Sequence, residues 1–420
     1  MFRTGAPIYA AATGAVAVTL LAGALGGVMA AGCWSASPGT INVTGGTGGA
    51  DTGGSPSGDG TGGATAGGSG GRIVGGGAGG TLVGPGGTGG DASCAGQPPP
   101  ASELIGWASQ PGMGFDGPTT GGGTATPIMA TSNASFNNAI AGTAPAVVYL
   151  MATLTGNFNI GSNKTVVGLC GGQVHGHIDV RGSSNVIVRN LKIVGYGVGD
   201  CSLDPSYDVT VGCSSGADAV TIQSGAHHVW FDHDDISDGT DGNLDVVNGS
   251  DFVTISWTKF HYTPRTDPVG NDSTGPSGHR FSNLIGSADN LPGDAGHLNI
   301  TWHHDWWADN VNQRMPRSRD GKIHMLNNLF TAVGDSYCTN AGVLASLLVE
   351  GNVYSGVRAP LQPATGGDML APTTGPGVNL FLNTSGLTTT TGVGFVPPYA
   401  YTPDPASTVA AAVMAGAGPQ

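Results

Sequence analysis

The stretch LNITWHHDWWADNVNQRMPRSRDGKIHMLNNLF (298–330) holds two similar segments, LNITWHHDW and KIHMLNNLF, whose starts lie 24 residues apart. In each, β-branched, aromatic or other apolar residues recur at every second position and then give way to Asn or Asp, as in a short strand followed by a turn. Four further segments share this pattern: NVIVRNLKI (185–193), HVWFDHDDI (228–236), FVTISWTKF (252–260) and SLLVEGNVY (346–354). The six starts are spaced by 43, 24, 46, 24 and 24 residues. A unit of about 24 residues, with two longer steps that are near-doubles or hold insertions, predicts a solenoid.

Parallel coiling of such strand units predicts an all-β fold, a right-handed parallel β-helix. Apolar residues at equivalent positions are then expected to stack inward as one column, among them Val186, Val253, Ile300 and Ile323. Glycines serve the corners, where a positive φ is needed. The recurring asparagines are expected to form a turn ladder of structural hydrogen bonds, with Asn190, Asn327, Asn328 and Asn352 as its members.

The composition is unusual for a globular protein. Of 420 residues, 76 are glycine and only 10% are charged, against roughly 25% in an average domain. This excludes an ordinary helical globule and points to an all-β fold together with a segment that does not fold. The formal net charge of −14 argues against a nucleic-acid partner, which requires a basic face. Taken alone, it also disfavours an anionic substrate.

The first 32 residues have the pattern of an export signal. They carry one charged side chain, Arg3, and an apolar stretch from Ile8 to Ala31 that leads into Gly32 and Cys33. Small residues directly before a cysteine suit a lipoprotein signal peptide with lipidation at Cys33. Ordinary cleavage near Ala31 and an uncleaved membrane anchor are the alternatives. We therefore expect a secreted or cell-surface protein, anchored by lipid in a bacterial envelope and touching the membrane only through that anchor.

Residues 33–94 are mostly Gly, Ser, Thr and Ala, with too few large apolar side chains for a core. This composition predicts a disordered, flexible linker. The folded domain is then expected to cover residues 95–420, which suffice for one sizeable core.

The cysteines agree with export, since their spacing does not suit a metal site. With Cys33 lipidated, five remain: Cys94, Cys170, Cys201, Cys213 and Cys338. Cys201 and Cys213 flank a loop and are a possible disulfide pair. An odd number leaves at least one thiol free.

Three acidic residues, Asp218, Asp241 and Asp245, stand out. If the turn between Asp241 and Asp245 folds back, both carboxylates face one cation together with Asp218 from the preceding coil. Oxygen ligands suit calcium better than zinc. The alternative is that these are ordinary turn residues, since Asp-Gly pairs are common in turns.

Three arginines lie within six residues, at Arg314, Arg317 and Arg319 around Pro316. Such a cluster is notable in a chain with 14 basic residues. Strand alternation favours placing some of them on the surface of the acidic group, although the proline leaves their faces unassigned. The alternative is a surface patch paired with neighbouring aspartates.

These motifs carry a family resemblance. The run WFDHDDIS, DGNLDVVNGSDFVTISWTKF, HRFSNLIGSAD, LNITWHHDWW and VNQRMPRSRDGKIHMLNN resembles the pectate lyases of the first polysaccharide lyase family, in the right order. SNKTVVGL (162–169), SNVIVRNLKI (184–193) and the C-terminal VPPYAYTPDPASTVAAAVMAGAG are also similar. The likeness covers about residues 104–420 and includes the specific element R-x-P-x-x-R.

The resemblance implies calcium-dependent β-elimination on polygalacturonate, and we expect the enzyme to be a monomer. Asp218, Asp241 and Asp245 match the calcium ligands. Arg314 matches the base that abstracts the C5 proton, and Arg319 matches a substrate-binding arginine, with Arg317 beside it assigned the same role. On this view the acidity of the chain reflects the calcium that bridges it to an anionic polymer.

Two positions depart from the family pattern. An acidic residue often found two positions before Asp218 is replaced by Gly216, and a uronate-binding lysine falls near Phe281, where Arg280 is the candidate replacement. Two other functions therefore stay open. One is a calcium-independent pectin lyase acting on methyl-esterified chains, and the other is a non-catalytic carbohydrate-binding β-helix.

Other polar and aromatic candidates are expected to be mainly structural. The repeat places His233, His303 and His304 beside the core or the ladder. Trp302 shares the face of Ile300 and is expected in the core, while sugar stacking is the alternative role for Trp302, Trp306 and Trp307.

Overall fold

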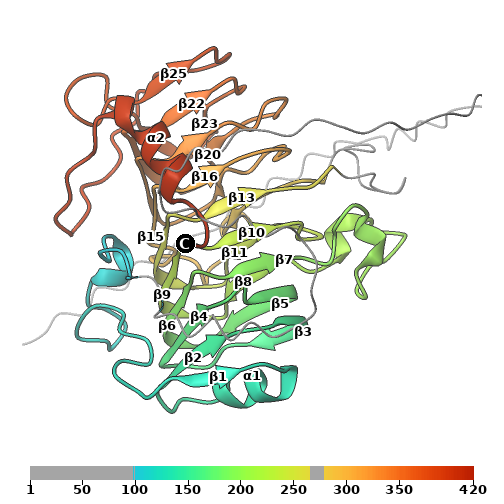
Figure 1. Cartoon of the computed structure of the whole chain (residues 1–420). Coiled ribbons are helices and arrows are strands. Elements are labelled where there is room, and N and C mark those ends of the chain that lie inside the picture. Colours follow the sequence, from blue (N-terminus) through green and yellow to red (C-terminus); the bar gives the residue numbers. More distant parts are fainter. Residues whose placement is uncertain (1–97, 99, 265–278) are drawn as a thin grey trace, which may run out of the picture. The chain divides into compact units, whose positions relative to one another are not determined.

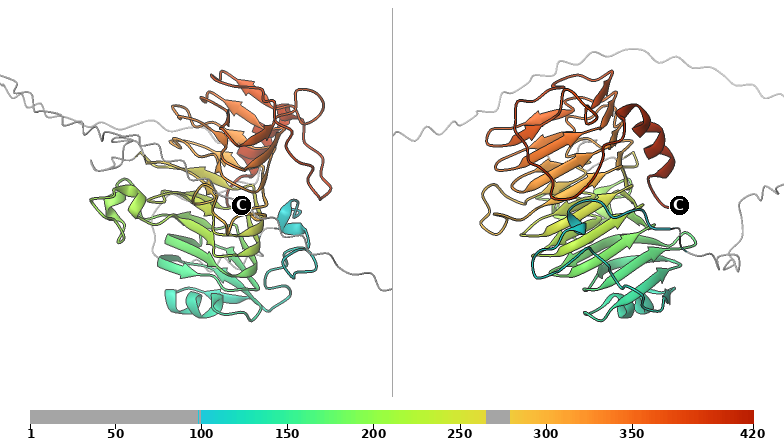
Figure 2. Two further views of the ribbon diagram at one scale, coloured as in Figure 1. Left: turned by 180° about the vertical axis from the view of Figure 1, so that it is seen from behind. Right: turned by 90° about the vertical axis from the view of Figure 1, so that its left-hand side faces the viewer.

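The computed structural model describes residues 98, 100–264 and 279–420. The predicted signal segment and linker, with Cys33 and Cys94, lie outside these residues. Short parallel strands are stacked coil upon coil, and the chain climbs the stack from α1 and β1 toward β25 (Figure 1, Figure 2). The predicted parallel β-helix is confirmed.

One sheet has ten parallel strands in the order of the chain. They are β1 (Ile128–Ala130), β2 (Ala146–Leu150), β4 (Lys164–Gly168), β6 (Ser184–Arg189), β9 (His227–Asp232), β12 (Asp251–Ser256), β15 (Ile300–His303), β18 (Lys322–Leu326), β21 (Ser346–Glu350) and β24 (Asp368–Leu370).

The other strands form two stacks joined at the nine-residue strand β5 (Gln173–Arg181), which pairs with β7 through its first half and with β8 through its second half. The first stack contains β3 (Thr153–Asn159), β7 (Lys192–Val194), β10 (Asp235–Ser237), β13 (Lys259–His261), β16 (Trp306–Trp307), β19 (Leu329–Phe330), β22 (Val353–Ser355) and β25 (Leu380–Leu382). The second contains β8 (Val220–Gln223), β11 (Leu244–Val246), β14 (Leu284–Ile285), β17 (Arg317–Ser318), β20 (Thr339–Ala341) and β23 (Leu361–Pro363).

Two α-helices flank the stack. Helix α1 (Asn133–Ile140) begins at a capping box on Ser132 and buries Phe136 and Ile140 at the N-terminal end of the core. Helix α2 (Ala406–Gly416) buries Val409 and Val413 against Leu329 and Val353. Three single turns of 3-10 helix lie in the connections, at Trp107–Ser109, Cys201–Leu203 and Cys213–Ser215. No helix in the described part of the chain is long and apolar enough to cross a bilayer.

The repeat that the sequence predicts is the coil of the structure. Each of the six segments supplies one strand of the ten-stranded sheet and the strand that follows it. The longer steps of 43 and 46 residues hold insertions rather than an extra coil, because one strand of the second stack lies in each of them, β8 and β14. In the sequence, the first insertion follows β7 and the second follows β13.

The inward column is confirmed. Val186, Val253, Ile300 and Ile323 are in register on successive coils, through Val229 on β9, and none is exposed to solvent. Trp302 and Trp307 lie in the same core and are fully buried, so a sugar-stacking role for them is wrong. Trp306 is half-buried, with Lys259 Nζ 4.9 Å from the centre of its ring.

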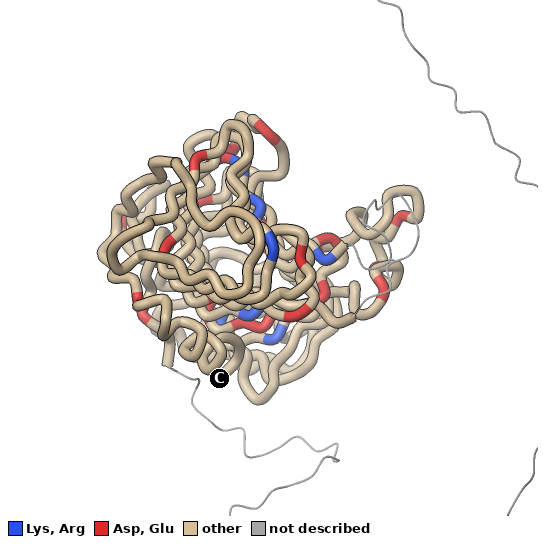
Figure 3. The backbone as a smooth tube through the Cα atoms, turned by 90° about the horizontal axis from the view of Figure 1, so that it is seen from above, with Lys and Arg blue, Asp and Glu red and all other residues tan. Residues whose placement is uncertain are grey.

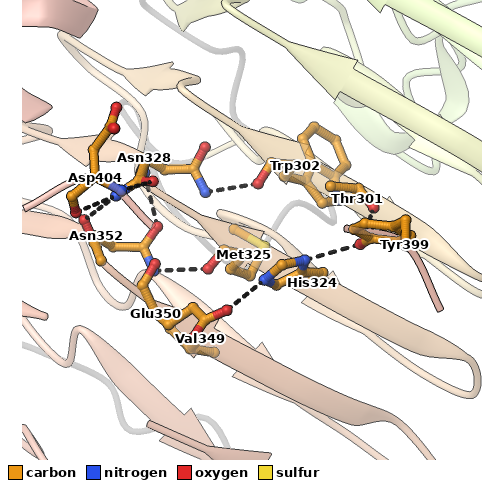
Figure 4. A network of polar contacts seen from close by, with 12 residues as sticks. Thr301, Trp302, His324, Met325, Asn328, Val349, Glu350, Asn352, Tyr399 and Asp404 are labelled. Carbon is orange, nitrogen blue, oxygen red and sulfur yellow. Dashed lines mark hydrogen bonds and ion pairs between the residues drawn. The ribbon is translucent and has the colours of Figure 1, made fainter. Parts of the chain in front are cut away.

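The asparagines divide into two neighbouring columns rather than one ladder, but all four make the predicted structural hydrogen bonds to backbone oxygens. Asn328 and Asn352 form the ladder: the amide N–H of Asn328 donates to Asn352 Oδ1 at 2.8 Å, and that of Asn352 to Asn379 Oδ1 at 2.9 Å. The side-chain amides of Asn328 and Asn352 donate to the carbonyl oxygens of Trp302 and Met325 (Figure 4).

Asn190 and Asn327 occupy the adjacent corner instead. Both have left-handed backbone, with φ of 55° and 54°. His233, Trp257 and His304 share this corner and this conformation. Their rings stack, with centroids 5.7 Å apart for His233–Trp257 and 4.3 Å apart for Trp257–His304.

The structural role expected for the histidines is confirmed. The Nε2 atom of His304 lies 3.1 Å from Asp404 Oδ2. His303 lies on β15, and burial, with its neighbour His304, lowers the pKa of His303 to about 3. These side chains serve packing at the corner of the coil.

Aspartates continue the ladder in the earlier coils. Asp305 Oδ1 accepts the N–H of Thr258, and Asp234 Oδ1 accepts the N–H of Leu191, both at 2.8 Å. The Oδ2 atom of each is buried with no hydrogen-bond partner among the described residues. In Asn328 and Asn352 the equivalent atom is an amide nitrogen that donates to a carbonyl. Burial raises the pKa of Asp234 and of Asp305 well above the ordinary value.

Asp305→Asn is therefore expected to stabilise the protein, and most at alkaline pH. Since folding raises the pKa of Asp305, the native chain keeps a proton that the unfolded chain releases above about pH 4, and stability falls as the pH rises. Asparagine removes this dependence and supplies the missing donor, a change of about 1–3 kcal/mol. Thermal melts at pH 5 and pH 9 check this; an equal or lower melting temperature for the variant at pH 9 contradicts it.

Candidate active site

Two of the predicted acidic residues come together on the second stack. Asp218 lies two residues before the start of β8. Its Oδ2 accepts a hydrogen bond from the Thr221 hydroxyl at 2.9 Å. Asp245 lies in β11, in register with Thr221, and its Oδ1 accepts the N–H of Leu284 on β14 at 2.9 Å. Backbone register thus brings the two carboxylates onto neighbouring coils.

Both carboxylates face a space that Gly242 leaves open. A Cβ atom at Gly242 would lie 2.9 Å from Asp218 Oδ1 and 3.2 Å from Asp245 Oδ1. Asp218 Oδ1 is buried and has no hydrogen-bond partner in the described part of the chain. A carboxylate oxygen in this state is a free ligand for a cation.

The electrostatics of the pair point the same way. Burial, with the nearby carboxylates of Asp245 and Asp241, raises the pKa of Asp218 well above its usual range. Burial and Asp241 raise the pKa of Asp245 to about 7. Negative charge is costly here until a positive charge joins the group.

The third acidic residue is bound elsewhere. Asp241 Oδ1 lies 2.7 Å from Nε2 of His279, a nearly buried histidine that the sequence patterns did not single out. Asp241 still contributes to the raised pKa of Asp218 and Asp245, so it lies near them. Within the described ranges, no three His, Cys, Asp or Glu side chains form a ready-made metal site.

Arg314 lies close to the acidic pair. Its backbone is left-handed, with φ of 63°, and its carbonyl oxygen accepts the N–H of Asn283 at 2.8 Å. The guanidinium carbon lies 4.4 Å from the centre of the Phe281 ring, and Nε is buried without a hydrogen-bond partner among the described residues. No described carboxylate forms an ion pair with Arg314. Its positive charge nevertheless partly offsets the raised pKa of both Asp218 and Asp245.

The other two arginines differ from Arg314 in their partners. Arg319 donates from Nε to Asp289 Oδ1 at 2.8 Å and from Nη1 to the carbonyl oxygen of Gly286 at 2.8 Å. Arg317, on β17, has a lowered pKa because of burial and the neighbouring charges of Arg319 and Arg314. The predicted pairing of an arginine patch with aspartates therefore describes Arg319 and not Arg314.

A groove of about 580 Å³ opens beside these arginines. Its lining includes Arg317, Arg319 and Tyr337, and further along the stack Asn340 and Gln362. One column of register runs through the site and up this groove. It contains Asp179, Thr221, Asp245, Leu284, Arg317, Asn340 and Gln362.

The two departures from the family pattern have visible surroundings. A side chain at Gly216 would begin 2.2 Å from Thr240 Cγ2 and 2.8 Å from Asp204 Oδ2, so there is no room for an acidic residue. Arg280 points Nη1 toward Asn310 Oδ1 at 3.4 Å, whereas its neighbour Phe281 is the residue that lies against Arg314. Substrate binding by Arg280 stays a prediction.

The loop that holds Asp204 is closed by a disulfide between Cys201 and Cys213. Asp204 Oδ2 accepts the N–H of Ala217, directly before Asp218. Cys170 is also disulfide-bonded, and the remaining described cysteine, Cys338, is a buried free thiol.

Charge is sparse along the backbone, and basic and acidic positions adjoin one another rather than forming one basic face (Figure 3). This distribution does not suit a nucleic-acid partner.

Comparison with known proteins agrees with the fold. A family model described as pectate lyase matches residues 93–418. Pectate lyase A of Dickeya chrysanthemi is 30% identical over 305 residues, covering 61% of this chain and 71% of that protein. Pectate lyase A of Aspergillus niger is 32% identical over 253 residues, covering 57% of this chain and 67% of that protein.

Solved structures share the fold. Pectate lyase Bsp165PelA from Bacillus sp. N165, solved in complex with trigalacturonate, superposes with a TM-score of 0.57 at 22% identity, covering 75% of this chain and 98% of that one. Pectate lyase C from Erwinia chrysanthemi gives a TM-score of 0.55 at 21% identity, covering 76% and 96%. The resemblance seen in the sequence is thus confirmed, and the chain belongs to the pectate lyase family of polysaccharide lyases.

Proposed function

We propose that this protein cleaves polygalacturonate by calcium-assisted β-elimination, with Arg314 as the base that removes the C5 proton. The observation that carries the proposal is the placement of Arg314, without a carboxylate partner among the described residues, beside the convergent carboxylates of Asp218 and Asp245. A candidate cation site and a guanidinium without a carboxylate partner in the described part of the chain are thereby near each other. Related proteins named pectate lyases support the substrate class.

The residues present fit a calcium ion. Asp218 and Asp245 offer oxygen ligands around the space at Gly242, and Asp241 has a second carboxylate oxygen besides the one that bonds to His279. When bound there, calcium would draw electron density from the uronate carboxylate and so increase the acidity of the C5 proton.

The protein's own residues then perform the reaction. Arg317 and Arg319, which line the groove, bind carboxylates of the polymer and orient it. Arginine acts as a base only in its neutral form, which is scarce because the guanidinium group is normally protonated, and positive charge nearby favours that neutral form. A neutral Arg314 accepts the C5 proton, the electron pair of that C–H bond forms a double bond between C4 and C5, and the bond from C4 to the bridging oxygen breaks. The departing oxygen takes a proton from water. The groove holds the sugar in position for this transfer.

One assay tests the proposal against both alternatives. The purified protein is mixed with polygalacturonate or with highly methylated pectin, with calcium or with a chelator, and the ultraviolet absorbance of the unsaturated product is followed. Product from polygalacturonate that requires calcium supports the proposal. Calcium-independent product from methylated pectin alone indicates a pectin lyase, and binding without product indicates a non-catalytic β-helix.

Gly242→Ala is expected to weaken calcium binding about 10–100-fold while leaving the fold intact. The added methyl group would fill the space between the two carboxylates, and Gly242 does not have a positive φ that would strain alanine. Calorimetric titration with calcium measures the effect. Gly293→Ala is a matched control, because a Cβ there meets no atom within 4 Å. Wild-type affinity in Gly242→Ala would place the calcium elsewhere.

We further propose that the protein is exported and anchored through a lipid on Cys33, as a monomer held off the membrane by residues 33–94. The small residues before Cys33 and the glycine-rich composition that follows support this. Labelling cells with a radioactive fatty acid tests it, since Cys33→Ser must abolish the label.

A further inference from the structure

Phe281 lies between the two halves of the candidate site. Isolated parallel bridges connect Gly242 to Phe281 and Phe281 to Gln313, the residue before Arg314. The carbonyl oxygen of Phe281 faces Gly242, 3.2 Å from where a Cβ would stand. Phe281 thus adjoins the carboxylate pair through its backbone and Arg314 through its ring.

The ring of Phe281 is the surface on which the guanidinium of Arg314 rests. The guanidinium carbon is 4.4 Å from the ring centroid, and the Phe281 side chain is nearly buried, with 7% exposure. The Phe281 ring also contacts the His279 ring, with centroids 4.3 Å apart. His279 in turn is hydrogen-bonded to Asp241. The ring is therefore fixed by groups that belong to the acidic cluster.

Arg314 needs such a support because little else holds it. Arg319 is fixed by a carboxylate and a carbonyl oxygen, whereas the Arg314 side chain rests on the Phe281 ring with its buried Nε lacking a hydrogen-bond partner in the described part of the chain. An arginine side chain loses considerable rotamer freedom when it is held in one place. A ring face orients the planar guanidinium by stacking.

We infer that Phe281 is a positioning residue that orients the guanidinium of Arg314 for proton abstraction, an inference that rests on the proposed function. The choice of an aromatic ring has a chemical reason. A carboxylate partner would orient Arg314 equally well, but it would favour the protonated form strongly and so oppose its use as a base. The ring supplies orientation with a weaker preference for the charged form.

The test compares Phe281→Leu, which keeps a buried apolar side chain but removes the ring, with Phe281→Tyr, which keeps the ring. Initial rates on polygalacturonate at saturating calcium give kcat and KM. We expect Phe281→Leu to lower kcat about 10–100-fold with KM within about 3-fold, because a small misplacement of a reacting group costs this much. Phe281→Tyr is expected to retain kcat within about 3-fold.

Phe381→Leu is the matched control, since Phe381 stacks on Tyr354 with centroids 5.2 Å apart in a stack of rings that does not include Arg314. It should leave kcat unchanged. If thermal melts show that Phe281→Leu is unfolded at the assay temperature, Phe281→Met replaces it with the same expectation.

An unchanged kcat in a folded Phe281→Leu or Phe281→Met variant overturns the inference, as does a change confined to KM. So does an equal loss in a folded Phe281→Tyr. Failure of the proposed function looks different, because the wild-type protein would then form no unsaturated product.

Discussion

Arg314→Lys is expected to lower kcat on polygalacturonate by about 10³-fold or more. Lysine keeps one positive charge, but its ammonium group has no planar face to lie against the Phe281 ring. Loss of a positioned base alone costs about 10²–10⁴-fold. Calcium affinity should change little, because Arg314 is not a ligand.

The measurement is the rate of unsaturated product at saturating calcium, with calcium binding followed separately by calorimetry. Arg181→Lys is the matched control, since Arg181 is exposed and pairs with Asp179 at 3.0 Å. A folded Arg314→Lys variant that retains more than about a tenth of the wild-type kcat would exclude Arg314 as the base.

The second large effect is expected from Asp245→Asn, which should lower activity about 10²-fold or more and yet stabilise the protein in the absence of calcium. Burial and Asp241 raise the pKa of Asp245 to about 7 in the folded protein. The unfolded chain releases this proton near pH 4, so wild-type stability falls as the pH rises from about 4 to about 7. Asparagine does not titrate and removes this loss.

Melting temperatures in chelator at pH 5 and pH 8 compare the protein with Asp245 protonated and with Asp245 ionised. The variant should exceed the wild type at pH 8, and the difference should shrink at pH 5. Added calcium should raise the melting temperature of the wild type and have little effect on the variant, because only a native site that binds the ion gains stability from it. A variant that is less stable than the wild type at pH 8 in chelator contradicts this account.

The coil could be predicted from sequence because its side chains obey a strict period. The alternation of apolar residues along the strands is enough to predict that Val253 and Ile300 belong to the inward column. The same alternation predicts the burial of Trp302. The asparagines were harder. Asn327 and Asn328 recur with the same period but differ by one residue, which places one in a left-handed corner and the other in the ladder. A period identifies the coil and does not identify the side chain's role in a turn.

The site was less accessible to such reasoning because its contacts cross coils. Three arginines close in sequence indicated the region, but only the structure shows that Asp289, 30 residues away, takes Arg319 and leaves Arg314 without a carboxylate partner among the described residues. His279 gave no local signal, since it acquires its role from Asp241 on another coil. Phe281 appeared only as a departure from the expected lysine, and its ring contact could not be inferred from that.

The column that runs from Asp245 through Arg317 to Asn340 and Gln362 places one side chain on each coil at a regular interval along the surface. The interval between these side chains is the distance between neighbouring parallel strands, about 4.8 Å. The side chain that one coil contributes to the column can be exchanged without moving the others, because each coil contacts mainly its neighbours. A longer footprint on a polymer therefore calls for another coil, and a different preference at one point along the polymer calls for a single substitution on one coil.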